Sequence, residues 1–160
     1  MRSALQQGRG GVDRNDAARD GRGMEIRQIL PAEAARELAA DPGAIYLDVR
    51  TPEEFDAGHP AGARNLPVFL LDPVARRPHP NQDFLPLARR HLAPTTRLLV
   101  GCQSGVRSQR ACELLADAGY TDLANVRGGF GGSHDPSEAP VAGWRDSGLP
   151  VETGPTGRLE

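Results

Sequence analysis

The chain has 160 residues, of which 38% are hydrophobic, so it can bury one core but has little room for a second domain. Its formal net charge is −2 and it has no long basic run, which argues against nucleic acid as a partner. No apolar run approaches the roughly 20 residues that a membrane-spanning helix needs. The two cysteines are too few for a disulfide framework and fit a reducing compartment. We therefore expect a single cytoplasmic domain with neither nucleic acid nor membrane as partner.

The first 23 residues are rich in glycine, arginine, aspartate and glutamine. Such a composition can bury little apolar surface, so we predict a disordered N-terminal tail over residues 1–23. A signal peptide would need an apolar core of about 7–15 residues, which this segment lacks. An organelle transit peptide is acid-poor, and Asp13, Asp16 and Asp20 do not fit that pattern. The folded domain is expected to begin at Met24.

Strand and helix patterns alternate after this tail. Residues 24–29 alternate weakly between polar and apolar side chains and predict a first strand. Pro31 suits the first turn of a helix with an inward stripe. That stripe consists of Ala34, Ala35 and Leu38. Residues 41–43 predict a turn, and 44–49 a mostly apolar strand of the buried, parallel kind. Strand, helix and strand form a βαβ unit, which indicates an α/β domain with a mainly parallel sheet.

A second helix start is encoded in Thr51-Pro52-Glu53-Glu54. Thr51 is the expected N-cap, and Glu54 completes a capping box by reaching back to the backbone N–H of Thr51. The short helix would direct Phe55 inward and end at Gly58.

Three polar residues flank this helix. Asp48 and Arg50 lie at a strand end, where such residues usually pair or cap, and His59 follows a glycine, where a histidine usually forms a local hydrogen bond. Structural roles are therefore expected for all three. Arg50 also stays a candidate for a second cation beside a catalytic pocket.

The middle of the chain is less informative. Residues 63–67 predict a short strand, and residues 83–92 predict a helix that tolerates Pro86 in its first turn. Between them, residues 72–81 contain three prolines, two arginines and a histidine, which predicts a solvated loop. Two roles stay open for this loop, a simple connection or the recognition of a partner.

The most informative stretch runs from Leu98 to Ser108. Residues 98–100 are continuously apolar and predict a buried strand, and from Ser104 onward the apolar spacing becomes helical. Cys102 would then lie at the carboxyl end of a strand, where open α/β sheets bind their ligands.

The composition of this loop favours chemistry at Cys102. Gly105 permits backbone angles that let consecutive N–H groups point at one site, helix N-terminal amides beyond Ser108 add partial positive charge, and Arg107 adds a full one. These features would stabilise a negative sulfur and make Cys102 a nucleophile. The alternative, an inert buried cysteine, explains neither the glycine nor the arginine.

The helix after the loop has a core-facing stripe that ends at Gly119. Cys112 lies on its flank and is expected to be a small core residue rather than a resolving thiol. Residues 120–126 predict a last short strand that closes the sheet. The glycine cluster at 128–132 lacks the Lys-Ser/Thr that a phosphate-binding loop would need.

Two stretches resemble the single-domain rhodanese family of sulfurtransferases. The segment Cys102-Gln103-Ser104-Gly105-Val106-Arg107-Ser108 is similar to the active-site loop of that family. Asp48-x-Arg50, followed by Glu54-Phe55 and Gly58-His59, is similar to its N-terminal signature, although Pro60 replaces the more usual isoleucine. Trp144 comes later than is usual in the family, which makes residues 130–143 an insertion that can wall the active-site cleft.

The resemblance implies a rhodanese-like α/β domain over residues 24–153, with a five-stranded, mainly parallel sheet, helices on both faces and a tail over 154–160. It implies a thiosulfate sulfurtransferase that needs no metal or organic cofactor. Cys102 would take a sulfane sulfur from a small anionic donor as a persulfide and pass it to cyanide, a thiol or a protein. The amides of Gln103, Ser104, Gly105, Val106, Arg107 and Ser108 would stabilise this sulfur. Arg107 would hold the anionic end of the donor or fix the loop.

Two other functions stay open. A cysteine phosphatase or arsenate reductase would use the same nucleophile, but it would need the wider Cys-x5-Arg loop, whereas this chain has Cys102-x4-Arg107. A non-catalytic interaction module is the second alternative, because a fold alone does not confer activity.

Overall fold

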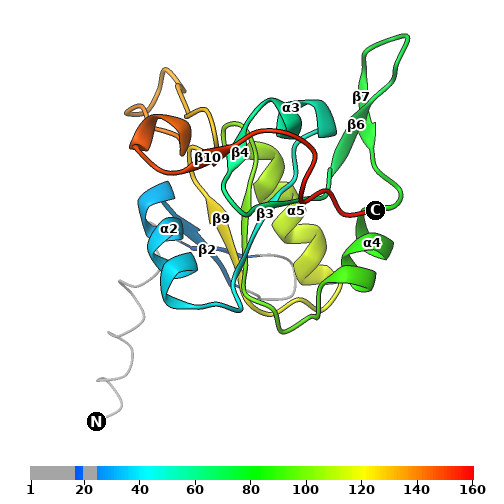
Figure 1. Ribbon diagram of the computed structural model, residues 1–160, viewed down its shortest axis with the longest axis horizontal. Helices are drawn as coiled ribbons and strands as arrows, with labels where there is room; N and C mark the ends of the chain where they lie inside the picture. Colours follow the sequence, from blue (N-terminus) through cyan, green and yellow to red (C-terminus); the bar gives the residue numbers. More distant parts are fainter. Residues whose placement is uncertain (1–16, 20–24) are drawn as a thin grey trace.

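The computed structural model describes residues 17–19 and 25–160 (Figure 1). Within these residues, six strands form one sheet in the order β1-β2-β9-β8-β3-β5. The strands are β1 (Ala17–Arg19), β2 (Glu25–Ile29), β9 (Leu123–Val126), β8 (Leu98–Gly101), β3 (Ile45–Asp48) and β5 (Arg64–Asn65). Every pair from β2 to β5 is parallel, and only β1 runs antiparallel, against β2. The predicted five-stranded parallel sheet is thus confirmed, with an antiparallel strand added at its edge.

That added strand falls within the segment predicted to be a disordered tail. The rest of the segment, residues 1–16 and 20–23, lies outside the described residues.

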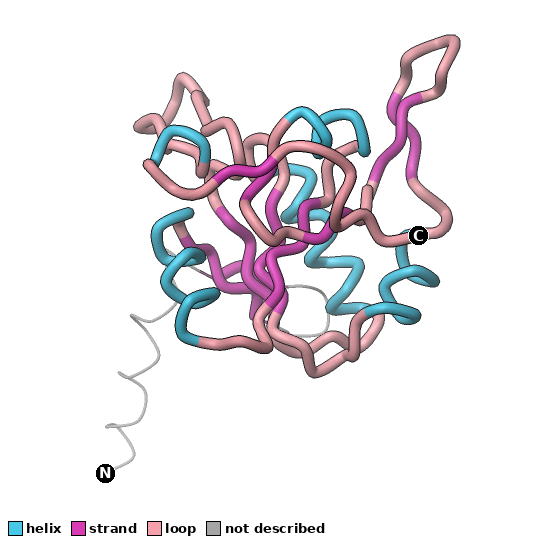
Figure 2. The backbone as a smooth tube through the Cα atoms, viewed as in Figure 1, coloured by secondary structure: helices cyan, strands magenta, loops and turns pink. Residues whose placement is uncertain are grey.

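Helices cover both faces of the sheet (Figures 1 and 2). On one face, α2 (Pro31–Ala40) and α3 (Pro52–Ala57) contribute Ala34 and Phe55 to a core cluster that includes Leu99. On the other, α4 (Phe84–His91) and α5 (Val106–Asp117) pack in a cluster that includes Leu98 and Val100. Neighbouring residues of β8 therefore point to opposite faces, as the strand period of two requires. The predicted two-layer cover of helices is confirmed.

One prediction about the sheet is wrong. The last strand, β9, does not close the sheet but lies inside it, between β2 and β8. All four of its residues are buried, which suits a strand that is paired on both sides and covered on both faces.

Two small strand pairs lie outside the main sheet. One joins β4 (His59–Pro60) to β10 (Val151–Glu152), and the other is a hairpin of β6 (Phe69–Leu71) and β7 (Pro78–Pro80). The hairpin projects from the domain near α4 (Figure 1). Residues 72–81, predicted to be a loop, thus include a strand, although residues 73–80 are exposed as expected.

The chain after the insertion contains one turn of 3-10 helix, η1 (Arg145–Ser147), directly after the buried Trp144. In the described part of the chain, no helix combines the length and apolar character that crossing a membrane requires.

Candidate active site

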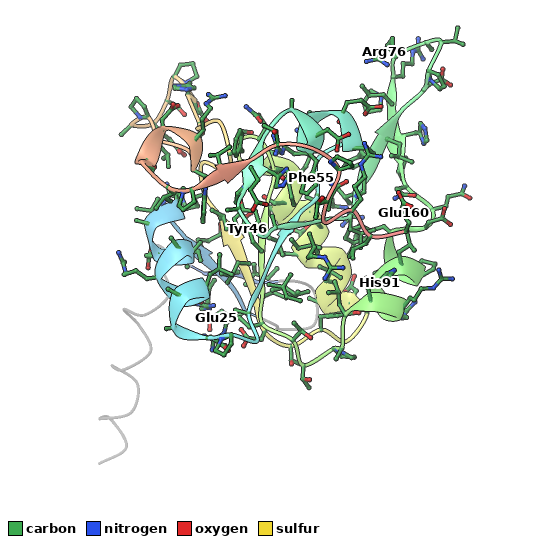
Figure 3. The ribbon with its side chains drawn as sticks, viewed as in Figure 1. Glu25, Tyr46, Phe55, Arg76, His91 and Glu160 are labelled. Carbon is green, nitrogen blue, oxygen red and sulfur yellow. The ribbon has the colours of Figure 1, made fainter. Side chains whose placement is uncertain are left out.

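Cys102 lies at the carboxyl edge of the sheet, directly after the interior strand β8. β8 lies between β9 and β3 and ends at Gly101, where a Cβ atom would fall 2.0 Å from the Tyr46 hydroxyl oxygen. Tyr46 lies in the interior of the domain (Figure 3). Glycine is therefore required at the last position of the strand, and Cys102 follows it directly.

Gly105 makes the short loop possible. Its φ of 111° lies in the left-handed region, and it serves as the N-cap of α5, which begins at Val106. Helical spacing was predicted from Ser104 onward, and the helix begins two residues later, with Arg107 and Ser108 in its first turn. Only three residues separate Cys102 from the first residue of the helix, Val106.

Two donors face the sulfur of Cys102. The Gly105 backbone N–H lies 3.1 Å from Sγ, and the Ser108 Oγ lies 3.3 Å from it. Cys102 is only 1% exposed, so these groups rather than bulk water surround the sulfur. Because an N–H at a helix start has no partner within the helix, it is free to bind a negative atom at this position.

The Ser108 hydroxyl is shared with Asn125 of β9. Asn125 Nδ2 donates to the Gly105 carbonyl at 3.2 Å and to Gln28 Oε1 at 2.9 Å. A carbonyl can only accept, so the amide orientation is fixed and Asn125 Oδ1 faces the Ser108 Oγ at 2.5 Å. The single hydroxyl hydrogen can therefore serve either Asn125 or the sulfur, but only one at a time.

Arg107 is held by Glu54 rather than left free. Its Nη1 and Nη2 donate to the two carboxylate oxygens of Glu54 at 2.8 and 3.0 Å. Burial raises the pKa of Glu54, but the hydrogen bonds and charge of Arg107 outweigh it, and the pKa is lowered overall. In the same ion pair, hydrogen bonding to Glu54 raises the pKa of Arg107. Of the two roles predicted for Arg107, this geometry favours fixing the loop.

Glu54 also completes the predicted capping box, which is confirmed. Its Oε1 accepts from the Thr51 backbone N–H at 3.1 Å, and its own N–H donates to Thr51 Oγ1 at 3.3 Å. The ion pair therefore connects the Cys102–Arg107 loop to a helix start that is itself well capped.

The residues flanking α3 have the structural contacts that were predicted for them. Arg50 is 2% exposed and donates to Asp48 Oδ2 and to the Gly58 carbonyl, each at 2.7 Å. His59 stacks on the Phe55 ring with centroids 3.6 Å apart, and its Nδ1 lies 2.7 Å from the Phe55 carbonyl oxygen.

Arg50 also reaches the Cys102–Arg107 loop, since its Nη1 lies 3.3 Å from Gln103 Oε1. Both residues line a cavity of about 540 Å³ together with Phe130 and Arg145. The Arg50 and Arg145 guanidinium groups lie 4.5 and 5.7 Å from the centre of the Phe130 ring. Glu54 lines the same cavity, so two guanidinium groups and one carboxylate border the space beside Gln103. Arg145 was not singled out from the sequence.

The insertion at residues 130–143 borders the loop from another side. Ser133, Asp135, Glu138 and Val141 line a cavity of about 500 Å³ whose lining also includes Ser104 and Gly105. The insertion therefore walls a space next to the Cys102–Arg107 loop, as the late position of Trp144 suggested.

The glycine cluster supports the loop that carries Cys102. The Cys102 and Gln103 carbonyls accept hydrogen bonds from the backbone of Phe130 and Gly131 at 2.8 and 2.9 Å. A Cβ at Gly129 would fall 2.2 Å from the Cys102 carbonyl oxygen, so only glycine permits this approach. The sequence gives no direct signal for this role.

Cys112 is a core residue, as predicted. It is fully buried within α5, and burial raises the pKa of its thiol. Across residues 17–19 and 25–160, no three histidine, cysteine, aspartate or glutamate residues are grouped to hold a metal ion.

Comparison with known proteins assigns the family. Residues 31–134 match the sequence model of the Rhodanese-like domain. The chain belongs to the rhodanese-like domain family. It is 38% identical over 132 residues to "Thiosulfate sulfurtransferase 16, chloroplastic" of Arabidopsis thaliana, covering 81% of this chain and 99% of that protein. It is 40% identical over 113 residues to "Thiosulfate sulfurtransferase 18" of the same plant, covering 69% and 74% of the two chains.

A solved structure agrees with this assignment. The crystal structure of Rv0390 from M. tuberculosis has a TM-score of 0.65 with this rhodanese-like domain and 29% sequence identity. The match covers 79% of this chain and 97% of that one.

Proposed function

We propose that this rhodanese-like domain is a thiosulfate sulfurtransferase with Cys102 as its nucleophile. The proposal rests on the position of the Cys102 sulfur at the start of α5, where the Gly105 N–H donates a hydrogen bond to it at 3.1 Å. Relatives named thiosulfate sulfurtransferase support the same activity.

The reaction has two balanced steps. The Cys102 thiolate attacks the outer sulfur of thiosulfate, a new S–S bond forms, the S–S bond of the donor breaks, and sulfite leaves with the electron pair. An acceptor nucleophile such as cyanide or a thiolate then attacks the terminal sulfur of the persulfide. The Cys102 thiolate leaves, so no external oxidant or reductant is consumed.

The site offers groups for both steps. The Cys102 thiolate attacks in the first step and leaves in the second, and the Gly105 N–H and the Ser108 hydroxyl that face its sulfur can stabilise its negative charge. The cavity beside Gln103 is lined by Arg50 and Arg145 as well as by Glu54, and its two guanidinium groups can bind the anionic end of a donor. Arg107 contributes by holding the loop against Glu54.

The test is steady-state thiocyanate production from thiosulfate and cyanide, with wild-type protein and Cys102→Ser. We expect parallel double-reciprocal lines, as for a ping-pong reaction, and no product from Cys102→Ser. An aryl phosphate and arsenate serve as alternative substrates. Turnover of either without thiocyanate formation, or full activity in Cys102→Ser, would contradict the proposal.

A further inference from the structure

An apolar groove lies beside the catalytic loop. Phe69, Leu70, Leu71 and Pro78 of the β6–β7 hairpin line a space of about 280 Å³, and Thr51 and Arg107 form its other wall. Thr51 is the N-cap of α3 and Arg107 is the last residue of the Cys102-x4-Arg107 loop. The groove therefore runs from the hairpin to the edge of the candidate active site.

The groove is small for a metabolite site. Small-molecule sites usually enclose roughly 300–1,000 Å³ and combine apolar walls with several polar groups. This one is lined mainly by apolar side chains. Its size and lining suit one or two apolar side chains of a partner.

The hairpin packs Phe69 against the core at its base, but the part beyond the groove is exposed. It projects from the domain (Figure 2), and Arg76 lies at its tip (Figure 3). Val74 is 91% exposed and Leu71 is 36% exposed. A two-stranded hairpin is marginally stable alone, and exposed apolar residues gathered at one place often mark an interaction surface.

The hairpin is also cationic. Residues 69–80, which form the hairpin, contain two arginines against one aspartate, a formal charge of +1 in a chain whose total is −2. The Asp72 carboxylate accepts hydrogen bonds from the Val74 and Ala75 backbone N–H groups of the hairpin at 2.9 and 2.7 Å. Among the described residues, neither Arg76 nor Arg77 forms an ion pair with a carboxylate. These two charges are available to an acidic partner.

We infer that the groove and the hairpin tip together dock an acidic protein segment that carries an apolar anchor residue. We call this the hairpin surface: Phe69, Leu70, Leu71, Arg76, Arg77 and Pro78. The anchor enters the groove, acidic side chains pair with Arg76 and Arg77, and the segment is held within reach of Cys102. The segment then delivers the acceptor thiol of the second transfer step, a role that rests on the proposed function. A protein segment is favoured over a lipid surface because the apolar lining is recessed between the hairpin and Arg107.

The binding experiment does not depend on sulfur transfer. The probe is a fluorescent peptide of alternating glutamate and leucine with a terminal serine. The control peptide has lysine in place of each glutamate. We expect the acidic peptide to bind, and each of Arg76→Glu and Arg77→Glu to weaken it by about fivefold. Leu71→Asp should weaken it at least as much. Arg36→Glu, at an exposed position of α2 on the opposite face of the sheet, is the matched control and should leave binding unchanged.

The transfer experiment uses the acidic peptide with a terminal cysteine. Protein loaded with sulfur from thiosulfate is mixed with this peptide or with free cysteine, and the rate of persulfide loss is measured. Arg76→Glu and Arg77→Glu should slow discharge by the peptide but not by free cysteine.

Three results would overturn the inference. They are equal binding of the lysine peptide, no effect of either arginine variant on binding, and binding to anionic phospholipid vesicles without binding to the acidic peptide. If the peptide binds as expected but no persulfide forms with any sulfane donor, the proposed function fails and docking stands. If the persulfide forms but the peptide does not bind, docking fails alone.

Discussion

The two cysteines of this chain are equally hidden from solvent but have opposite surroundings. Cys102 is 1% exposed and Cys112 is 0% exposed. Cys102 precedes the first turn of α5, where backbone N–H groups have no helical partner, and it receives the Gly105 N–H. Cys112 lies inside the same helix among apolar side chains, and burial raises the pKa of its thiol. Burial alone does not decide whether a thiol is inert, because the decisive difference is the presence of donors that face the sulfur.

The largest expected effect comes from changing the backbone that supplies this donor. Gly105→Ala places a side chain at a φ of 111°, which strains the loop and moves the N–H away from the sulfur. We expect sulfur transfer to fall by about tenfold or more. Gly119→Ala is the matched control, because Gly119 follows the other end of α5 with a φ of 100° and open space around it.

Both glycine variants should lose about 1–2 kcal/mol of unfolding free energy in urea titrations. Only Gly105→Ala should lose activity beyond what its stability explains. Equal activity in the two variants would show that the loop geometry at Gly105 does not matter for transfer.

The next effect concerns the hydroxyl shared between the sulfur and Asn125. Ser108→Ala removes a donor from Cys102 and leaves the buried Asn125 Oδ1 without its Ser108 partner. We expect slower persulfide formation and a loss of about 1–3 kcal/mol in unfolding free energy. Ser104→Ala in the same loop is the control. It should change neither the rate of persulfide formation, measured by rapid mixing, nor the unfolding free energy, measured in urea. If Ser104→Ala had the same effects, the Asn125 contact would not be their cause.

A smaller effect is expected from the ion pair that fixes the loop. In wild type the lowered pKa of Glu54 adds stability that is present above its ordinary value of 4.5 and is lost as the pH falls through the lowered pKa. Arg107→Met removes the group that lowers it, so the variant should lose about 1 kcal/mol near neutral pH and show less further loss in acid. Urea unfolding at a series of pH values measures both the loss of stability near neutral pH and its further loss in acid. An unchanged acid dependence would mean that the pair does not stabilise the loop.

The smallest effect on transfer is expected at the other cysteine. Because the folded-state pKa of Cys112 is raised, the unfolded chain ionises first, and stability should decrease as the pH rises above the ordinary thiol value of 9.0. The loss amounts to about 1.4 kcal/mol per pH unit for this group. Cys112→Ala should flatten that slope between pH 9 and 10 and leave transfer unchanged. A slope that persists in Cys112→Ala would assign it to other groups.

The sequence predicts the parts of the site that depend on local pattern. The apolar run before Gly101, the single glycine in the loop and the Thr51 to Glu54 capping box each have a local physical cause, and each is found as expected. Helical spacing was predicted from Ser104 onward, and the helix begins at Val106 because Gly105, in the left-handed region, serves as its N-cap.

Contacts between distant segments could not be predicted in the same way. The partner of Arg107 is 53 residues away at Glu54, and Ser108 meets Asn125 only because β9 lies next to β8. A signal was present, since Asn125 interrupts an otherwise apolar buried strand and so needs polar partners. The position of β9 inside the sheet was missed because the order of parallel strands is set by crossover connections rather than by the strand sequence.

The most direct test of the account is the intact mass of reduced protein after incubation with thiosulfate, in wild type, Cys102→Ser and Cys112→Ala. We predict a gain of one sulfur atom in wild type and in Cys112→Ala, removed by cyanide, and none in Cys102→Ser. A gain that persists in Cys102→Ser, or that disappears in Cys112→Ala, would contradict the assignment of the nucleophile to the sulfur at the start of α5.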